Sequence, residues 1–357
     1  MTDMIAAEPA LAGRLVDRAA RDKSVPALVA WIRDAAGGSR PITTTGCGTS
    51  EHAAMAAAHL LGNAIDARHA HLVRSRQALD LVRDPQGDGL LIGFSHDGGT
   101  WATNEALARS RRAGARTALV TVSDRSPGAA MVELVVETRE QDQSWCHTVG
   151  YLSPIVVSAA LAATLAGQRL DGVAVRALLE IATDEPEAEH VASALAGCAR
   201  LIVAGSGMDY VSARELALKV EEGAGLSATA LHTETVLHGH LAAASNDSGL
   251  VLICTDAEPD GEAVRERARA VLRSAQILGM SVASILGARV GPEIPLVLTK
   301  AGRLTAPEAN HVRPDAEAIL GAAIPLQLLA ERLALAKGRN PDPIGRDDPL
   351  QAAAAEA

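Results

Sequence analysis

The sequence predicts an α/β fold of two similar domains, each with a parallel β-sheet flanked by helices. Short apolar or β-branched runs alternate with helical patterns along most of the chain, as in parallel sheets covered on both faces. Of the 357 residues 48% are hydrophobic, yet only one is Phe, two are Tyr and three are Trp. The core therefore has to be closely packed Ala, Val and Leu. The order strand, Gly-x-Gly, helix also occurs twice, which indicates a tandem repeat.

Four segments are expected along the chain. Residues 1–36 form an N-terminal helical segment, 37–182 the first domain, 190–338 the second domain and 339–357 a C-terminal tail. The polar stretch 183–189 is the predicted linker between the domains. The tail is rich in Pro, Asp and Ala and is expected to be irregular and at the surface.

The individual elements follow from length and periodicity. Short apolar runs in the first domain predict the strands Ile42–Thr45, His69–Val73, Leu90–Ser95, Thr117–Val122 and Val132–Glu137. Helical patterns predict Pro9–Ala36, Glu51–Asn63, Trp101–Ala113 and Thr148–Ala166. In the second domain the expected strands are Arg200–Ala204, Leu250–Thr255, Ser281–Leu286 and Leu296–Thr299. The expected helices there are Tyr210–Glu222 and Asp315–Lys337.

Charge and composition narrow the class of protein. A formal net charge of −10 argues against a nucleic acid or an anionic membrane as partner, since both need basic surfaces. We expect no membrane span, because no apolar run approaches about 18 residues, and no signal peptide at the N-terminus. The four cysteines are scattered without a Cys-x-x-Cys pair, which favours free thiols and a cytoplasmic location.

Two turns carry the candidate binding residues. The first is Cys47-Gly48-Thr49-Ser50 and the second is Ser95-His96-Asp97-Gly98-Gly99-Thr100. Each follows a predicted strand and opens a helix, so hydroxyl groups and free backbone N–H groups gather where the helix dipole favours an anion such as a sugar phosphate. The alternative is that the Ser and Thr side chains only cap these helices.

These turns, with three later motifs, resemble the sugar isomerase (SIS) domain family. Cys47-Gly48-Thr49-Ser50 matches the first phosphate-binding turn of the family, and Ser95, Gly98 and Thr100 match the second. Glu215–Glu222 resembles the catalytic helix, Leu237-His238-Gly239 the following His-Gly turn, and Ile324–Leu329 the last helix. The resemblance covers most of the chain, from about Ile42 to Arg339. Its two-domain plan resembles that of the isomerase half of glutamine–fructose-6-phosphate aminotransferase and of stand-alone fructosamine deglycases and amino-sugar-phosphate isomerase/deaminases.

The resemblance implies an enzyme that moves a proton between C1 and C2 of an open-chain phosphosugar. Glu222 then corresponds to the catalytic base, and His238 to an acid–base group that reaches the active site of the neighbouring subunit in a homodimer. Such chemistry needs a carboxylate near the carbons and a second group to open the ring or protonate a leaving amine. Lys219, one helical turn before Glu222, either assists the developing oxyanion or only pairs with Glu215.

Three departures from the family pattern affect the expected reaction. Residue 2 is Thr rather than a nucleophilic Cys, so we expect no glutaminase activity. The tail 342–349 has no Lys to form an imine with the sugar, which leaves noncovalent acid–base chemistry. Asp97 replaces the usual Ser of the second turn. It either caps the helix Gly98–Ala113 with its side chain turned from the ligand, or it contacts a sugar with a smaller anionic group or none.

Further candidates lie before the last helix of the first domain. Asp142 and Thr148 keep the family's spacing for sugar contacts, and Trp145 is either a wall of the sugar site or a core residue. No metal is expected, because the nearby histidines lack a recognisable ligand set: His52, His59, His69 and His71. No cofactor is expected either.

The predicted function is a phosphosugar isomerase or a related deglycase or deaminase. One alternative is a sensor that binds a sugar phosphate without turning it over. Another is an isomerase of a non-phosphorylated sugar. The sequence does not name the sugar.

Overall fold

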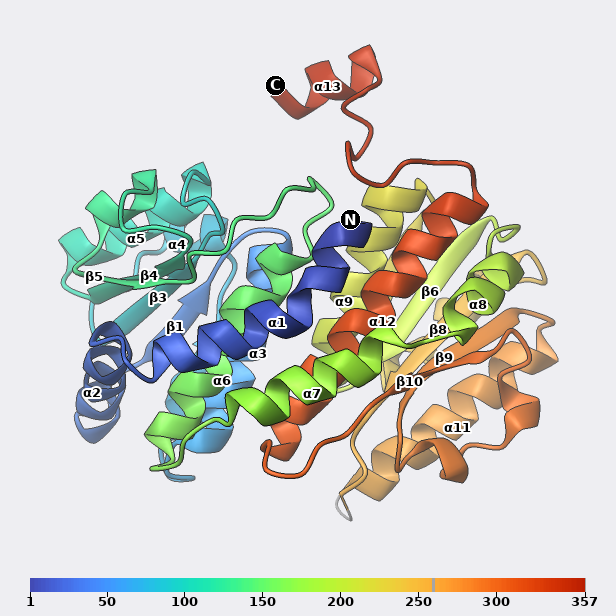
Figure 1. Cartoon of the computed structure of the whole chain (residues 1–357), viewed down its shortest axis with the longest axis horizontal. Helices are drawn as coiled ribbons and strands as arrows, with labels where there is room; N and C mark the ends of the chain where they lie inside the picture. Colours follow the sequence, from blue (N-terminus) through green and yellow to red (C-terminus); the bar gives the residue numbers. More distant parts are fainter. Residues whose placement is uncertain (259–260, 357) are drawn as a thin grey trace.

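Two five-stranded parallel sheets form the frame of the protein in a computed structural model that describes residues 1–258 and 261–356 (Figure 1). The first sheet has the order β2 (Val73–Ser75), β1 (Ile42–Thr45), β3 (Leu90–Phe94), β4 (Arg116–Thr121) and β5 (Leu134–Glu137). The second has the order β10 (Arg303–Ala306), β9 (Ser281–Gly287), β8 (Ser248–Cys254), β6 (Arg200–Gly205) and β7 (Ala228–His232). Read from β7, the second sheet repeats the strand order of the first.

Helices connect and cover the strands. Those of the first half are α1 (Thr2–Ala19), α2 (Ser24–Gly37), α3 (Thr49–Ala64), α4 (Ala78–Arg83), α5 (Trp101–Ala113) and α6 (Val149–Leu165). The second half follows with α7 (Gly172–Thr183), α8 (Glu187–Leu195), α9 (Met208–Lys219), α10 (Thr233–Val236), α11 (Glu262–Ile277), α12 (Pro314–Ala336) and α13 (Pro349–Glu356).

The two sheets are joined by helices that pack between them. Figure 1 shows α1, α3, α6, α7, α9 and α12 in this central layer, and α3 contacts both α6 of its own half and α9 of the other. Their apolar residues belong to one continuous core. By length and composition α12 would be able to cross a membrane, but 78% of its most apolar window is buried inside the protein. Its apolar character is therefore explained by its place in this layer.

The second sheet corrects one predicted strand. Leu296–Leu298 forms a short 3₁₀ turn, and the edge strand is β10 instead. Leu296 and Val297 are 78% and 61% exposed, so this apolar run is not a buried one, whereas Leu304 of β10 is fully buried. None of the residues of strand β7 is buried, which explains why no apolar run in the sequence indicated it.

Further differences concern element boundaries, and the predicted helix Pro9–Ala36 is two helices, α1 and α2. The predicted strand His69–Val73 is strand only from Val73, after a 3₁₀ turn over Ala70–Leu72. The stretch 183–189 is mostly helical, because α8 begins at Glu187 and buries Val191 and Leu195. Glu187 also lies in the first turn of α8, where the helix dipole favours a carboxylate. The tail is not wholly irregular either, since it ends in α13.

Candidate active site

A cleft of about 520 Å³ opens beyond the carboxyl ends of β1 and β3, next to the end of α9. In sheets with this strand order the connections from β1 and β3 leave on opposite faces, which creates a crevice suited to ligands. Predicted site residues that line it are Cys47, Gly48, Thr49, Ser50, His96, Asp97, Thr100, Asp142, Trp145 and Glu222. Lining residues that the sequence did not single out are Gln141, Gln143, Ser144, His147, Gly150, Ile344 and Arg346.

The first turn presents backbone and hydroxyl groups at the start of α3. Gly46 lies so close to the carbonyl of Ser50 that a Cβ there would clash with it, and Gly48 has a φ of +56° that favours glycine. The sharp turn leads directly into α3 without a side-chain cap on its N-terminus. The Ser50 and Glu51 N–H groups donate to the carbonyls of Cys47 and Gly48, which leaves the Thr49 N–H at the start of the helix for an anion. Cys47 is half-buried, and burial raises the pKa of its thiol.

The second turn differs from the predicted arrangement at Asp97. Helix α5 begins at Trp101 with Thr100 as its N-cap residue, so Asp97 does not cap it. Instead the exposed Asp97 accepts a hydrogen bond from the Gly99 N–H at 2.9 Å and lines the cleft. Ser95 is buried below the surface of the cleft, 3.2 Å from the Thr100 hydroxyl. Gly98 has a φ of +70° and packs against Ser126, outside the cleft lining.

The corresponding turn of the second domain contains a buried carboxylate. Gly207, with a φ of +57°, opens α9 as Gly48 opens α3. Two positions later, the buried Asp209 accepts hydrogen bonds from the backbone N–H and the hydroxyl of Thr255, at 2.9 Å and 2.5 Å. Burial raises the pKa of Asp209 to about 6. The N–H and hydroxyl of Thr255 are therefore engaged internally, although Ser206, Gly207 and Met208 still line a cavity of about 370 Å³.

Glu222 is the carboxylate that α9 delivers to the cleft. It lies in a wider π-helical turn, Val220–Ala224, which directly follows α9. Its Oε2 accepts a hydrogen bond from Lys219 Nζ at 2.8 Å, while 23% of its side chain stays exposed. The neighbouring Glu221 faces away from the cleft and accepts the Ala228 N–H at the start of β7.

Lys219 lies beneath the cleft and joins the two domains. Its fully buried Nζ donates to Thr49 Oγ1 at 3.0 Å and lies 3.2 Å from Glu215 Oε1, so it both pairs with Glu215 and supports Glu222. His52 Nδ1 lies 2.6 Å from the other oxygen of Glu215. Burial alone would lower the pKa of Lys219, but the two carboxylates outweigh it and raise that pKa. The ammonium group is a fixed positive charge under the cleft.

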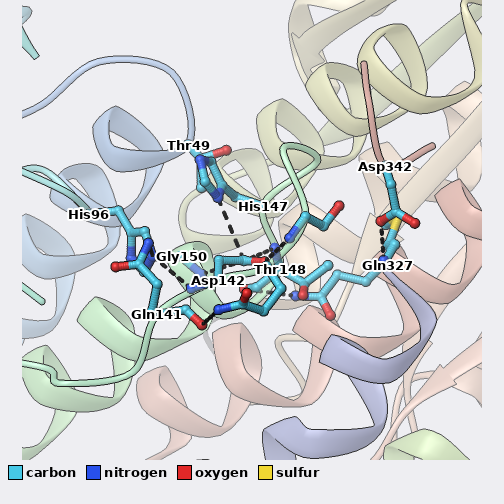
Figure 2. A network of polar contacts seen from close by, with 12 residues as sticks. Thr49, His96, Gln141, Asp142, His147, Thr148, Gly150, Gln327 and Asp342 are labelled. Atoms are coloured by element: carbon cyan, nitrogen blue, oxygen red, sulfur yellow. Dashed lines mark hydrogen bonds and ion pairs between the residues drawn. The ribbon is translucent and has the colours of Figure 1, made fainter. Parts of the chain in front are cut away.

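Asp142 organises the loop that precedes α6. Its carboxylate accepts N–H groups of Ser144, Thr148 and Gly150 at 2.8–3.0 Å (Figure 2). Burial would raise its pKa, but His147 and these N–H groups lower it to about 2. Thr148 is fully buried at the start of α6 and does not line the cleft. Asp142 and Thr148 thus shape the loop, and the loop presents its neighbours to the cleft.

Two histidines are among the neighbours that Asp142 positions. His147 Nδ1 lies 3.6 Å from Asp142 Oδ2, and His96 Nε2 accepts the Asp142 N–H at 3.0 Å (Figure 2). Their ring centroids are 5.3 Å apart. Burial and the neighbouring His147 lower the pKa of His96 to about 4, so His96 is neutral at physiological pH. His147 stands beside Cys146 in the loop, and sequence reasoning passed over it because its orientation depends on Asp142.

His238 does not line this cleft. It lies after α10 with a 70% exposed side chain, and its Nε2 is 2.8 Å from Glu234 Oε1. The predicted role of His238 in the cleft of a neighbouring subunit stays a prediction. Within residues 1–258 and 261–356, no group of three or more His, Cys, Asp or Glu is placed to hold a metal ion.

Solved structures with a similar fold include enzymes named for sugar phosphates. The C-terminal domain of glucosamine-fructose-6-phosphate aminotransferase from Francisella tularensis has a TM-score of 0.78 at 19% identity, covering 95% of this chain and 96% of that chain. Tagatose-6-phosphate ketose/aldose isomerase from Escherichia coli has a TM-score of 0.74 at 18% identity, covering 96% and 94%. Glucosamine-6-phosphate deaminase from Thermotoga maritima has a TM-score of 0.62 at 16% identity, covering 85% and 88%.

These likenesses confirm the predicted fold of two parallel sheets flanked by helices, the one implied by the resemblance to sugar isomerase domains. No protein-family profile and no curated protein sequence matches the chain.

Proposed function

We propose that this protein is an acid–base enzyme that moves a proton between C1 and C2 of a phosphosugar. The observation that carries the proposal is the position of Glu222, whose partly exposed carboxylate lines the same cleft as the hydroxyl turn Cys47–Ser50. The reaction is an aldose–ketose isomerisation, or the related release of an amine from an amino sugar phosphate. Among the solved structures with a similar fold, one is named a ketose/aldose isomerase and another a deaminase.

The phosphate is bound at the first turn. The Ser50 hydroxyl and the Thr49 N–H at the start of α3 supply donors, whereas the Thr49 hydroxyl donates to Glu215. The helix dipole adds a favourable potential. This cradle leaves the reducing end of the sugar to extend towards Glu222 and the loop 141–147.

Three carboxylates line the cleft: Asp97, Asp142 and Glu222. Glu222 acts as the base because its contact is with a single cation, Lys219. Asp142 is fully engaged with backbone N–H groups, and Asp97 is at the surface of the turn. The second acid–base group is His238 of the partner subunit or His147 of the same chain. His147 has the advantage of lying in the cleft, oriented by Asp142.

The proposal is tested by NMR in D₂O with a panel of sugar phosphates and amino sugar phosphates. A proton shuttle between C1 and C2 exposes the proton to solvent, so we expect deuterium to appear at C1 or C2 of one panel member together with product. Binding of panel members by calorimetry, with neither exchange nor product, would instead establish a sugar-phosphate sensor.

Asp97→Ser tests whether the ligand of this cleft is phosphorylated. Asp97 is exposed, so its repulsion with a phosphate about 4 Å away is on the order of 1 kcal/mol. We expect the variant to bind glucitol 6-phosphate roughly fivefold more tightly by calorimetry, since about 1.4 kcal/mol corresponds to a factor of ten.

The matched control is Asp80→Ser, an equal change of charge on the exposed face of α4. If Asp97 instead holds a hydroxyl of a neutral sugar, wild type would prefer glucitol to its 6-phosphate and the variant would lose that preference. That result would contradict the phosphosugar class and leave the fold unaffected.

A further inference from the structure

The second domain has a cavity at the place where the first domain has its cleft. The cavity measures about 370 Å³ and lies beyond the carboxyl ends of β6 and β8, which take the places of β1 and β3 in the second sheet. The connections from these strands leave on opposite faces, as they do in the first sheet. Cavities of this size are typical of sites for small organic molecules.

Helices α3 and α9 each take part in both sites. Helix α3 begins at the cleft, and Asn63 near its end lines the cavity. Helix α9 begins at the cavity, and Glu222 just after it lines the cleft. The two helices are opened by Gly48 and Gly207, with φ of +56° and +57°, so positions along them can be compared by counting from these glycines.

Two differences at matched positions change the chemistry of the second site. Two residues after the opening glycine, the cleft has the hydroxyl of Ser50, whereas the cavity has the carboxylate of Asp209. Fifteen residues after it, the cleft has Glu222 and the cavity has the amide of Asn63. The cavity therefore repeats the plan of the cleft with a negative charge at its turn and no carboxylate at the position of the base.

Acidic side chains dominate the lining of the cavity. Within the described residues, six carboxylates line it against one Lys or Arg, Arg289, which pairs with Glu308. The six are Asp209, Asp256, Glu258, Glu308, Asp315 and Glu317. Asp315 also pairs with Arg313 outside the lining. The remaining charge would repel an anion and attract an ammonium group.

Two of these carboxylates are buried and only partly satisfied. The Glu317 side chain is 9% exposed, and its Oε1 accepts the Ala309 N–H at 3.2 Å and lies 4.0 Å from Arg289. Its Oε2 accepts no hydrogen bond within residues 1–258 and 261–356. Asp209 is held by Thr255 alone among the same residues. Burial raises the pKa of both carboxyl groups, because their partners do not fully replace the lost water.

We infer that this cavity is a binding site for a small hydroxylated amine, which is held through its ammonium group by Asp209 and Glu317. Hydrogen bonds between an ammonium group and a carboxylate are among the strong ones in proteins. The Ser206 hydroxyl and the Met208 N–H at the start of α9 line the cavity as donors for the hydroxyl groups of the ligand.

Other classes of ligand fit the cavity less well. A phosphate or carboxylate on the ligand would be repelled by the acidic lining. A metal ion is a poorer match, since no group of three or more His, Cys, Asp or Glu in the described part of the chain is placed to hold one. The cavity is separate from the cleft with Glu222, so this site does not depend on the proposed reaction.

Calorimetry with three probes that differ only at C1 tests the charge of the ligand. Glucamine, glucitol and gluconate share the hydroxylated carbons C2–C6 and carry an ammonium, a hydroxyl and a carboxylate group at C1. We expect wild type to bind glucamine about tenfold or more tightly than glucitol, the scale of a hydrogen bond between charged groups. Gluconate should bind more weakly than glucitol. Equal affinities, a preference for gluconate, or no binding of any probe would overturn the site.

Variants place the bound amine in the second domain. We expect Asp209→Asn and Glu317→Gln each to weaken glucamine binding by at least about fivefold and to leave glucitol binding within twofold. Each amide keeps an oxygen for its backbone N–H partner, and the two residues lie on different helices, so either variant can test the site alone if the other fails to fold.

Glu222→Gln is the matched control, because it removes the carboxylate of the first cleft and should bind glucamine as wild type does. A loss of glucamine binding in Glu222→Gln, with full binding in Asp209→Asn and Glu317→Gln, would place the amine in the cleft and overturn the second site.

Discussion

Glu222→Gln is expected to lower the rate of C1–C2 deuterium exchange by at least about 100-fold, the lower end of the range for a lost general base. The amide keeps the size of the side chain and an oxygen that can accept the hydrogen bond from Lys219, so the cleft should keep its shape. It cannot accept the substrate proton. Exchange measured by NMR under saturating substrate reports the chemical step, and calorimetry shows that the ligand still binds.

The neighbouring carboxylate gives a matched control. Glu221→Gln makes the same chemical change one residue earlier, on a side chain that points to β7 rather than into the cleft. We expect exchange within a factor of about two of wild type, as for a surface substitution away from the site. If Glu222→Gln also stayed within a few-fold of wild type, Glu222 would not be the base. His147, which lines the same cleft, would then be the first group to examine.

The parts of the site that sequence predicted are those set by local backbone geometry. A strand, a sharp glycine turn and a helix start are encoded within a few residues, and the predicted binding residues Cys47–Ser50 do line the cleft. Glu222 was found through its motif on a helix whose end is defined by nearby residues. The parallel sheets followed in the same way from local alternation of strand and helix patterns.

The parts that sequence missed depend on contacts between distant segments. Arg346 reaches the cleft because Asp342 contacts both Met1 and the loop at Trp145. No short pattern in a tail rich in Pro and Asp encodes that contact. His147 is oriented by Asp142, and Asp142 was itself expected to contact the sugar rather than three backbone N–H groups. Such roles depend on which groups are buried together.

Burial changes how much the i,i+4 pair of Glu215 and Lys219 contributes to stability. Glu215 and Lys219 are four residues apart on α9, and on an exposed helix such a pair stabilises by only a few tenths of a kcal/mol. Here both side chains are fully buried, and the ammonium group is shared with Glu222 and Thr49. The network also crosses from the second domain to the first, through Thr49 and His52. The same contacts therefore stabilise the packing of the two domains and hold the carboxylate of Glu222, the proposed base, in position.

Lys219→Met is expected to lower the free energy of unfolding by about 3–5 kcal/mol, because it leaves Glu215 as a buried carboxylate without its cation. Denaturant unfolding measures the change, and Arg176→Met, which breaks an exposed pair with Glu180 at the same spacing on α7, should cost less than about 1 kcal/mol. Adding Glu215→Gln to Lys219→Met removes the uncompensated charge and should recover part of the loss, a non-additivity that independent sites do not show. Equal small losses for Lys219→Met and Arg176→Met, with no recovery in the double variant, would mean that the buried network does not hold the domains together.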